Sequence, residues 1–100
     1  MAQKIYKLFL IKGFTEAWYQ LSKEEQTAAM VKVNAALEKV GGQRLALCDS
    51  RWASEQWPAF GVEVFPDIEA EQKHIQLLSE FDWFRYLEAM TVLGTEWQPV

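Results

Sequence analysis

The stretch IYKLFLIKGFTEAWYQLSKEEQ, residues 5–26, decides the fold of this 100-residue chain. From Ile5 to Lys12 it alternates two sets of mostly apolar side chains, so both faces need cover, which is typical of an interior β-strand. Gly13 then lets the chain turn away from the sheet, and Thr15 can cap a short helical turn carrying Trp18. We therefore expect a central strand that leads into a tryptophan-bearing turn.

A longer helix is predicted directly after this turn. Ser22 followed three residues later by Glu25 is a capping box, in which each side chain satisfies a free amide at the start of the helix. The glycines Gly41-Gly42 provide a stop after Val40. One apolar stripe runs along this helix at spacings of three and four residues, formed by Ala29, Met30, Val33, Leu37 and Val40.

The rest of the chain predicts two strands, a helix and a last strand. Trp57-Pro58 lies in a connection too short for a crossover helix, which favours an antiparallel hairpin, and Asp67 can cap the second helix. The expected segments are Arg44–Trp52, Ala59–Phe65, Ile68–Phe81 and Tyr86–Leu93. The order βαββαβ predicts one α+β, ferredoxin-like domain over residues 1–100, with a four-stranded antiparallel sheet and both helices on one face.

The strand residues divide into two sets by face. The set without charge is expected under the helices: Tyr6, Leu8, Leu10, Ala46, Cys48, Phe60, Val62, Val64, Leu87, Ala89 and Leu93. The other set is expected to face away: Ile5, Lys7, Phe9, Ile11, Leu47, Asp49, Arg51, Glu63, Phe65, Tyr86, Glu88, Met90 and Val92. This second face is too apolar to leave in water, so we predict a homodimer in which two sheets pack face to face as a barrel.

Composition excludes several classes of function. The formal charge of -4, with dispersed Lys and Arg, lacks the basic patch of a nucleic-acid-binding protein. Apolar runs fall well short of the roughly 20 residues of a membrane helix, so no membrane partner is expected. The single Cys48 cannot form an internal disulfide and reads as an inert core residue, and Met1–Lys12 lacks a signal-peptide pattern, so we expect a cytoplasmic protein.

The segment LFLIKGFTEAWYQLSKEEQ, residues 8–26, resembles the darcynin-type and related small bacterial proteins of uncharacterised function. Further along, the strand order and the segment DWFRYLEAM, residues 82–90, are similar to the dimeric α+β barrel superfamily. This resemblance implies a dimeric barrel. Superfamily members include cofactor-independent monooxygenases, haem-degrading enzymes, lactone isomerases, polyketide cyclases and proteins without known activity, so the fold does not select a reaction.

His74 is the only histidine and lies in the middle of the apolar stripe of the second helix. A neutral imidazole can act as a general base or as an axial metal ligand. The alternative is a half-buried histidine bonded to a backbone carbonyl. No cofactor is predicted, but a haem would be coordinated by His74. Zinc is not predicted, because one His and one Cys cannot supply its usual three or four ligands without recruiting carboxylates.

Aromatic and charged residues supply the other candidate contacts. Five tryptophans in so short a chain are enough to line a flat pocket, although packing in the core or an interface explains each of them as well. Asp49, Arg51 and Glu63 fit either an acid-base site or interfacial ion pairs, and Lys7 is a candidate partner for Glu63. The predicted ligand-binding residues are Tyr6, Trp18, Arg51, Trp57, Glu63 and Trp83.

These observations predict a homodimeric barrel protein that binds a small apolar or aromatic molecule in a cleft between helices and sheet. His74 would be the base if a reaction such as oxygenation, isomerisation or cyclisation follows. A non-enzymatic interaction protein is the alternative. A deep cavity beside His74 favours the first hypothesis and a filled core favours the second.

Overall fold

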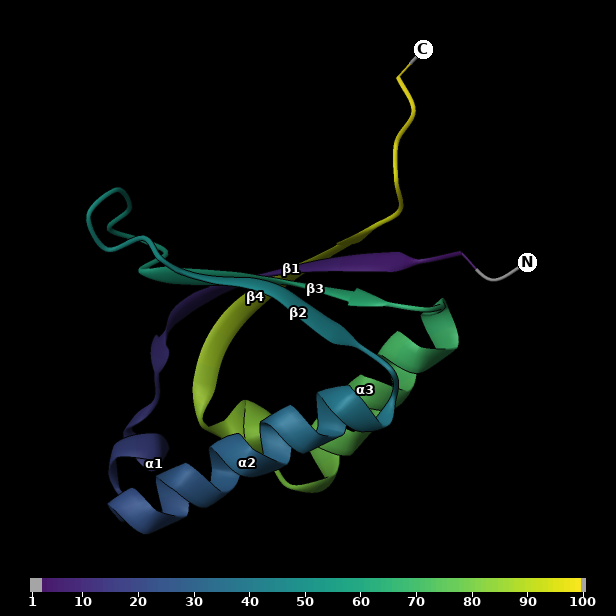
Figure 1. The fold of residues 1–100 in the computed structure, drawn as a ribbon. Helices are drawn as coiled ribbons and strands as arrows, with labels where there is room; N and C mark the ends of the chain where they lie inside the picture. The colour runs from purple at the N-terminus through teal and green to yellow at the C-terminus, as the bar shows by residue number, and fades with distance from the viewer. Residues whose placement is uncertain (1–2, 100) are drawn as a thin grey trace.

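The computed structural model describes residues 3–99, which form one four-stranded sheet and a layer of helices (Figure 1). The elements are β1 (Ile5–Phe14), α1 (Glu16–Tyr19), α2 (Lys23–Lys39), β2 (Gln43–Asp49), β3 (Ala59–Phe65), α3 (Ile68–Glu80), the 3₁₀ turn η1 (Trp83–Arg85) and β4 (Leu87–Gly94). Apart from the short α1 and η1, this is the predicted order βαββαβ.

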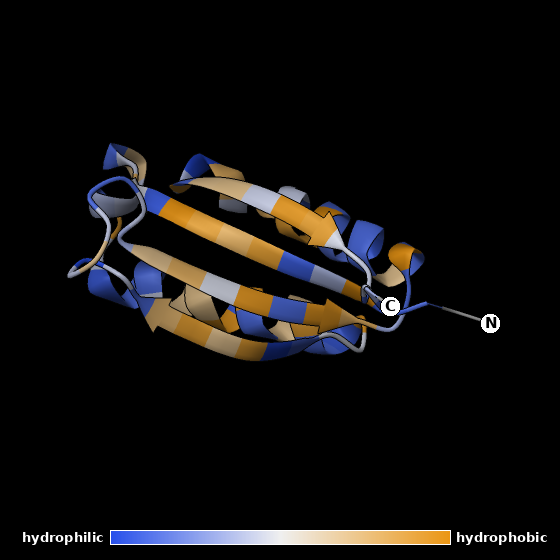
Figure 2. Ribbon diagram, turned by 90° about the horizontal axis from the view of Figure 1, so that it is seen from above, coloured by the Kyte–Doolittle hydropathy of each residue, from blue (hydrophilic) through white to orange (hydrophobic). Residues whose placement is uncertain are grey.

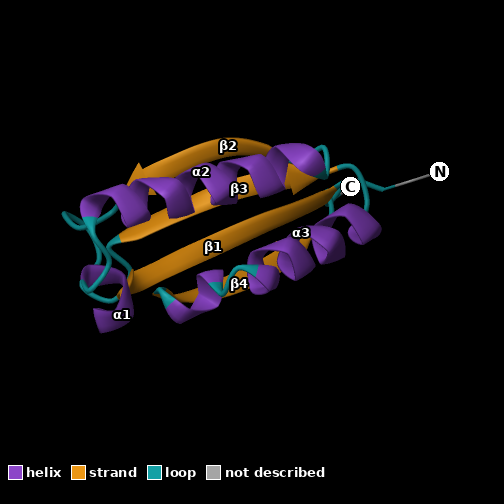
Figure 3. Ribbon diagram, turned by 90° about the horizontal axis from the view of Figure 1, so that it is seen from below, coloured by secondary structure: helices purple, strands orange, loops and turns teal. Residues whose placement is uncertain are grey.

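The strands lie in the order β2-β3-β1-β4, and every neighbouring pair is antiparallel. Helices α2 and α3 cover the same face of the sheet (Figures 1 and 3). This is the ferredoxin-like arrangement, and it confirms the predicted fold class. β1, at the centre with β3, is the interior strand expected from its two apolar faces.

The predicted helix ends are confirmed by their hydrogen bonds. The amide of Glu25 donates to the Ser22 hydroxyl over 3.1 Å, and the amide of Ser22 donates to the Glu25 carboxylate over 2.9 Å. Gly41 ends α2 with a left-handed φ of 76°, which suits a residue without Cβ. Asp67 caps α3 by accepting a 2.7 Å hydrogen bond from the amide of Ala70.

Two local expectations are wrong. The hydroxyl of Thr15 does not cap α1 but donates to the carbonyl of Arg85 over 2.7 Å, tying the start of α1 to the end of η1. β2 ends at Asp49 rather than Trp52, because the carbonyl of Ser50 accepts the amide of Ala53 and closes a turn.

The assignment of sheet faces is the main correction. The register of β1 and β3 places Ile5 opposite Phe65 and Lys7 opposite Glu63. Ile5 and Phe65 pack in a buried cluster with Leu37 of α2, and the ammonium of Lys7 approaches a carboxylate of α3. The charged set of β1 and β3 therefore faces the helices, and the uncharged set faces away from them.

β2 follows the same inverted assignment, whereas β4 was predicted correctly. Leu10 lies opposite Met90 and Leu8 opposite Val92, on the face without helices, while Leu87 packs against the core of the helix layer. We call this uncovered surface the outer face; Figure 2 looks onto it. Its residues are Tyr6, Leu8, Leu10, Ala46, Cys48, Phe60, Val62, Val64, Met90 and Val92.

The error has a simple physical reason. Alternation in a strand separates its residues into two sets but does not say which set is covered, and the deciding criterion was the absence of charge. That criterion fails when buried charges have partners. Here Lys7 pairs with Glu71 of α3, and Glu63 pairs with Arg44 of β2. The uncharged set was then taken for the core.

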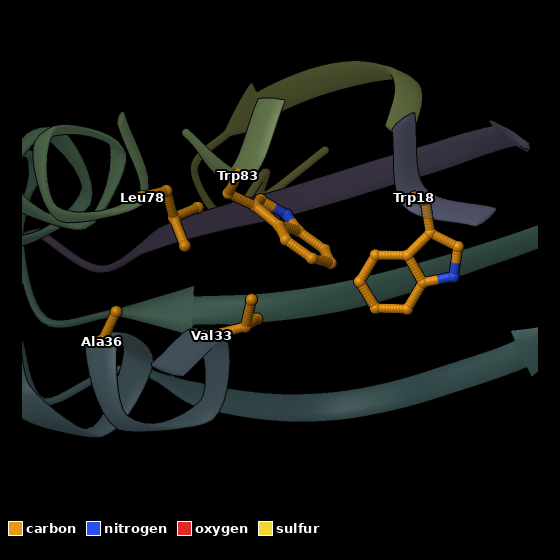
Figure 4. Packing of buried hydrophobic residues seen from close by; sticks show 5 residues of the cluster. All are labelled: Trp18, Val33, Ala36, Leu78 and Trp83. Atoms are coloured by element: carbon orange, nitrogen blue, oxygen red, sulfur yellow. The ribbon is translucent and has the colours of Figure 1, made fainter. Parts of the chain in front are cut away.

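The helix layer holds the larger apolar cluster, at the end of the molecule near α1 and η1 (Figure 4). Trp18 and Trp83 meet edge to face with their ring centroids 5.8 Å apart, a favourable aromatic geometry. The buried members are Trp18, Val33, Ala36, Leu78 and Trp83. The smaller cluster of Ile5, Leu37 and Phe65 is separate from it.

Candidate ligand-binding site

A cavity of about 1050 Å³ lies between the sheet and the helix layer. Its volume is at the upper end of the roughly 300 to 1,000 Å³ that small-molecule sites span. Residues from the sheet, from α2, α3 and η1 and from the connecting loops line this cleft, including Lys7, Phe9, Ile11, Met30, Val33, Arg44, Leu47, Asp49, Arg51, Glu63, His74, Leu78, Trp83, Phe84 and Leu87. A filled core, which would have favoured a purely structural protein, is not what the described residues show.

Aromatic rings form much of the wall of the cleft. The ring of Phe9 lies directly over Gly61 of the neighbouring strand, so that a Cβ at position 61 would clash with it. Trp83 lines the cleft and also packs in the apolar cluster of the helix layer. The next residue, Phe84, is half exposed. These rings give the cleft flat apolar surfaces, which suit a planar molecule.

Five polar side chains form what we call the polar cluster: Lys7, Arg44, Glu63 and His74 line one part of the cleft, and Glu71 joins them through its ion pair with Lys7. Lys7, Glu63, Glu71 and His74 are each no more than 4% exposed, and the side chain of Arg44 is 27% exposed. They come from β1, β2 and β3 of the sheet and from α3. Burial of so many ionisable groups is costly unless they are well paired, so their pairing decides what the cluster can do.

The ion pairs of the polar cluster are loose. The ammonium of Lys7 lies 3.7 Å from the carboxylate of Glu71, and the guanidinium of Arg44 lies 3.3 Å from that of Glu63. Charge-assisted hydrogen bonds are usually shorter, roughly 2.7 to 2.9 Å. Arg44 makes its shorter contact, 3.0 Å, with the amide oxygen of Asn34 on α2.

The imidazole of His74 is the most isolated polar group. Both ring nitrogens are buried and have no hydrogen-bond partner within residues 3–99, while the ring packs against Phe65 with centroids 5.2 Å apart. Burial, followed by the nearby charges of Lys7 and Arg44, lowers the pKa of His74 to about 4. The ring is therefore neutral at neutral pH, with one nitrogen able to donate and the other to accept.

Burial also shifts the pKa values of Lys7 and Glu63. Desolvation lowers the pKa of Lys7, although the charges of Glu63 and Glu71 oppose the shift. Desolvation raises the pKa of Glu63, against the opposing charges of Lys7 and Arg44. Both shifts disfavour the charged form, which is expected where the partners are too distant to compensate fully for lost water.

Asp49 and Arg51 form a separate, exposed pair that also borders the cleft. The guanidinium of Arg51 lies 2.7 Å from the Asp49 carboxylate, and their side chains are 78% and 55% exposed. Hydrogen bonds from the Arg51 side chain and amide lower the pKa of Asp49 to about 2. The pair is charged at all ordinary pH values and is accessible from solvent.

The structure brings four of the predicted site residues together. His74, Arg51, Glu63 and Trp83 all line the cleft, so residues expected on two different faces of the sheet share one site. The predicted pairing of Lys7 with Glu63 is only partly seen: the two lie opposite each other, but their ion pairs are with Glu71 and Arg44.

The other three predicted residues lie elsewhere. Tyr6 is on the outer face, where its hydroxyl donates to the Glu96 carboxylate over 2.7 Å and this bond raises the pKa of Tyr6. Trp18 belongs to the apolar cluster of the helix layer. Trp57 is half-buried in the β2–β3 connection, where its carbonyl accepts a hydrogen bond from the Ser50 hydroxyl.

Sequence reasoning missed Glu71 and Arg44. Glu71 precedes His74 by three residues, and this spacing places both on one side of a helix, so the signal was present. Arg44 stands at the start of β2, where the register shifts between Arg44 and Ala46, and an irregularity of that kind has no reliable sequence signature.

Comparison with known proteins identifies the fold. We find no protein family and no curated protein that matches this sequence. Among solved structures, a protein of unknown function from Rhodopseudomonas palustris matches with a TM-score of 0.69 and 14% identity, over 99% of this chain and 86% of that one. A protein from Shewanella oneidensis matches with a TM-score of 0.57 and 20% identity, over 96% and 93%.

A mutant chlorite dismutase from Candidatus Nitrospira defluvii matches with a TM-score of 0.70 and 16% identity, over 96% of this chain. The chain spans only 41% of that enzyme's length. At these identities the likeness shows the fold alone. It supports the expected ferredoxin-like α+β fold, and the darcynin-type resemblance gains no support from it.

Two other kinds of feature are absent from the described residues. Within residues 3–99, no group of three or more His, Cys, Asp or Glu side chains is arranged to hold a metal ion. None of the helices in the same range combines the length and apolar character needed to cross a bilayer.

Proposed function

We propose that this protein binds a small, largely apolar or aromatic molecule in the cleft between sheet and helices. The observation that carries the proposal is the position of His74, whose two buried nitrogens lack partners on the wall of a cavity of about 1050 Å³. An unpaired buried polar group costs roughly 1 to 3 kcal/mol. A molecule bound in the cleft that forms a hydrogen bond with His74 would offset that cost.

If the bound molecule is transformed, we propose proton removal as the reaction, in the manner of cofactor-independent oxygenation, isomerisation or cyclisation. His74 is neutral at pH 7 and so is in the basic form that this step needs. Its low pKa makes it a weak base, and Glu63, whose pKa is raised, stands in the same polar cluster. The alternative, a non-enzymatic interaction protein, has the exposed outer face in its favour.

Native mass spectrometry of the purified protein tests the proposal directly. We expect a retained small molecule, or uptake of aromatic probes such as naphthalene derivatives, with one molecule per chain. The variant His74→Leu should lose or weaken this binding while remaining folded. A wild-type protein that neither retains a molecule nor takes up an aromatic probe would favour the interaction-protein alternative.

We also propose that the protein is a homodimer, now through the outer face. The strand residues of this surface carry no charge, although Glu96 of the following segment bonds to Tyr6 there, and Met90 and Val92 are left 45% and 50% exposed. Large exposed apolar patches usually mark an interface. The segment after Gly94 also runs away from the sheet on this side (Figure 1), and it carries Trp97, which is 83% exposed.

Haem is the second candidate ligand. The residues fit in one respect, because His74 is a neutral imidazole with both nitrogens unpaired among the described residues. Bound haem would supply redox chemistry at its iron, and His74 would hold it. Both nitrogens are covered, so neighbouring side chains must move for an iron to reach one of them.

A hemin titration tests this candidate. We expect a shift of the Soret band with the wild-type protein that the His74→Ala variant abolishes. Identical spectra for the two proteins would remove haem as a ligand of His74 and would leave the proposal of an organic ligand untouched.

We further propose that the protein works in the cytoplasm. The chain has one cysteine, Cys48, which is free, and unpaired cysteines are typical of reducing compartments.

A further inference from the structure

The polar cluster has hydrogen-bonding capacity that its own members do not use. Lys7 and Glu71 stand 3.7 Å apart, Arg44 and Glu63 stand 3.3 Å apart, and His74 has no partner among the described residues. A lysine ammonium carries three donors and a carboxylate about four acceptor sites, so each ion pair leaves several positions free. A polar group of a ligand is needed to complete the cluster.

The charges of the cluster are already balanced. Two cations, Lys7 and Arg44, face two carboxylates, Glu63 and Glu71, and the imidazole of His74 is neutral. A ligand that brought a full charge would place an uncompensated ion among side chains that are mostly buried, which is strongly unfavourable. The polar group of the ligand is therefore uncharged when it binds.

The same group has to donate as well as accept. Among the groups that line the cleft, Lys7 is a donor only, Glu63 on the neighbouring strand is an acceptor only, and His74 offers one of each, so a group between them is best matched by a hydroxyl. A carbonyl oxygen only accepts and would offer no donor to the carboxylate of Glu63. A carboxylate both accepts only and adds a charge.

The rest of the cleft selects the body of the molecule. The end of the Phe9 ring lies over Gly61 on the sheet side, and Trp83 and Phe84 line the cleft from the η1 side. Flat aromatic surfaces favour a planar aromatic partner, since stacked and edge-to-face contacts add about 0.5 to 1.5 kcal/mol to the burial of area.

We propose that the ligand of this cleft is a planar hydroxyaromatic molecule, of the phenol or naphthol class, whose hydroxyl lies between Lys7, Glu63 and His74, the three groups that line the cleft there. This inference rests on the proposed function, because it names the class of molecule for the same cleft. Lys7 is the residue that determines the preference for a hydroxyl, since it is the buried cation of the pair with Glu71.

Three probes of nearly equal shape separate the possibilities: 2-naphthol, 2-methylnaphthalene and 2-naphthoate. Their dissociation constants are measured by calorimetry or by quenching of tryptophan fluorescence, since Trp83 lines the cleft. We expect 2-naphthol to bind about tenfold more tightly than 2-methylnaphthalene, because one hydrogen bond to a charged group contributes on the order of 1.5 kcal/mol. The naphthoate should bind most weakly.

The variant Lys7→Met should remove the advantage of 2-naphthol and leave the affinity for 2-methylnaphthalene unchanged. Lys12→Met, at an exposed lysine of the same strand, is the matched control and should bind all three probes as the wild type does. If Lys7→Met does not fold, the double variant Lys7→Met with Glu71→Leu removes both partners together and carries the same expectation.

The outcomes separate this inference from the proposed function. Equal affinity for 2-naphthol and 2-methylnaphthalene, or tightest binding of the naphthoate, would overturn the hydroxyl preference while the cleft remained a binding site. Failure of all three probes to bind would remove the proposed function and this inference with it. A 2-naphthol preference that survives the loss of Lys7 would overturn the role of that residue.

Discussion

The two faces of the sheet invert the usual relation between charge and burial. The face under the helices carries Lys7 and Glu63, each 4% exposed, whereas the outer face has no charge but leaves residues such as Val92 half exposed. A buried charge persists only when it has partners, and an exposed apolar surface persists only when something covers it. The first face is therefore where chemistry is expected, and the second is where association is expected.

Neighbouring residues of β1 test this contrast most strongly. Leu8 faces outward and Phe9 faces the cleft, so the same substitution at each should have opposite effects. Leu8→Asp would bury an unpaired charge in the proposed dimer, which costs several kcal/mol and should raise the dimer dissociation constant more than about a hundredfold. Probe binding in the cleft should survive.

Phe9→Asp should do the reverse, leaving the dimer intact and weakening the binding of aromatic probes. Light scattering reports the mass of each variant, and Val31→Asp, at an exposed position on α2, is the control for an added charge. A wild-type protein that is monomeric at high micromolar concentration would contradict the dimer. Dissociation by Phe9→Asp and not by Leu8→Asp would contradict the assignment of faces.

The buried ion pair offers the next largest effect. Lys7→Met leaves Glu71 buried without its cation and should lower the free energy of unfolding by about 3 kcal/mol. Adding Glu71→Leu removes the orphaned carboxylate as well, so the double variant should recover most of this loss. Urea unfolding at one fixed protein concentration measures both values. Simple additivity of the two substitutions would show that the pair is not coupled.

The close approach of Phe9 to Gly61 predicts a smaller effect. Gly61→Ala places a methyl group where the ring of Phe9 lies, so the ring must move toward the cleft, at a cost of roughly 1 to 3 kcal/mol. Affinity for aromatic probes should fall with it. Gly94→Ala is the matched control, because a Cβ there meets no atom within 4 Å. Equal thermal stability of the two variants would mean that Phe9 does not rest on Gly61.

These tests concern what the sequence leaves ambiguous. The order of elements follows from local signals, such as the capping box at Ser22 and the glycine that ends α2, because such signals act within a few residues. The faces of the sheet depend on contacts between segments far apart in sequence, such as Lys7 with Glu71. Alternation along a strand does not contain that information.

The same distinction holds within the candidate site. His74 could be identified from the sequence because it is the only histidine and sits in an apolar stripe. Its surroundings could not, because Lys7 and Arg44 come near it only through the packing of the sheet on α3, and the place of Arg44 depends on a register shift in β2. Trp18 and Trp57 are candidates for ligand contact because they lie in connections between predicted elements. Tertiary packing instead places Trp18 in the apolar cluster and Trp57 in the β2–β3 connection.

The smallest expected effect belongs to His74→Leu at pH 7. The imidazole has no hydrogen-bond partner among the described residues, so replacing it with an apolar side chain of similar size leaves no known partner unsatisfied. The free energy of unfolding should stay the same or rise by about 1 kcal/mol. The binding of 2-naphthol should weaken, which separates a residue of the site from a residue of the framework.

Lowering the pH enlarges this difference in a predictable direction. The pKa of His74 falls from 6.5 to about 4 on folding, so between these values the unfolded chain binds the proton and the folded chain does not. The wild-type protein should lose stability as the pH falls through this range, on the order of 2 to 3 kcal/mol in total. Glu63, with its raised pKa, acts in the opposite sense, but both proteins retain it.

The Leu variant should therefore show a flatter profile in urea unfolding at pH 7, 6, 5 and 4. A variant that is clearly less stable at pH 7, keeps the slope of the wild type and still binds the probe would show that His74 is a structural residue with a partner, and the interaction-protein hypothesis would then be preferred.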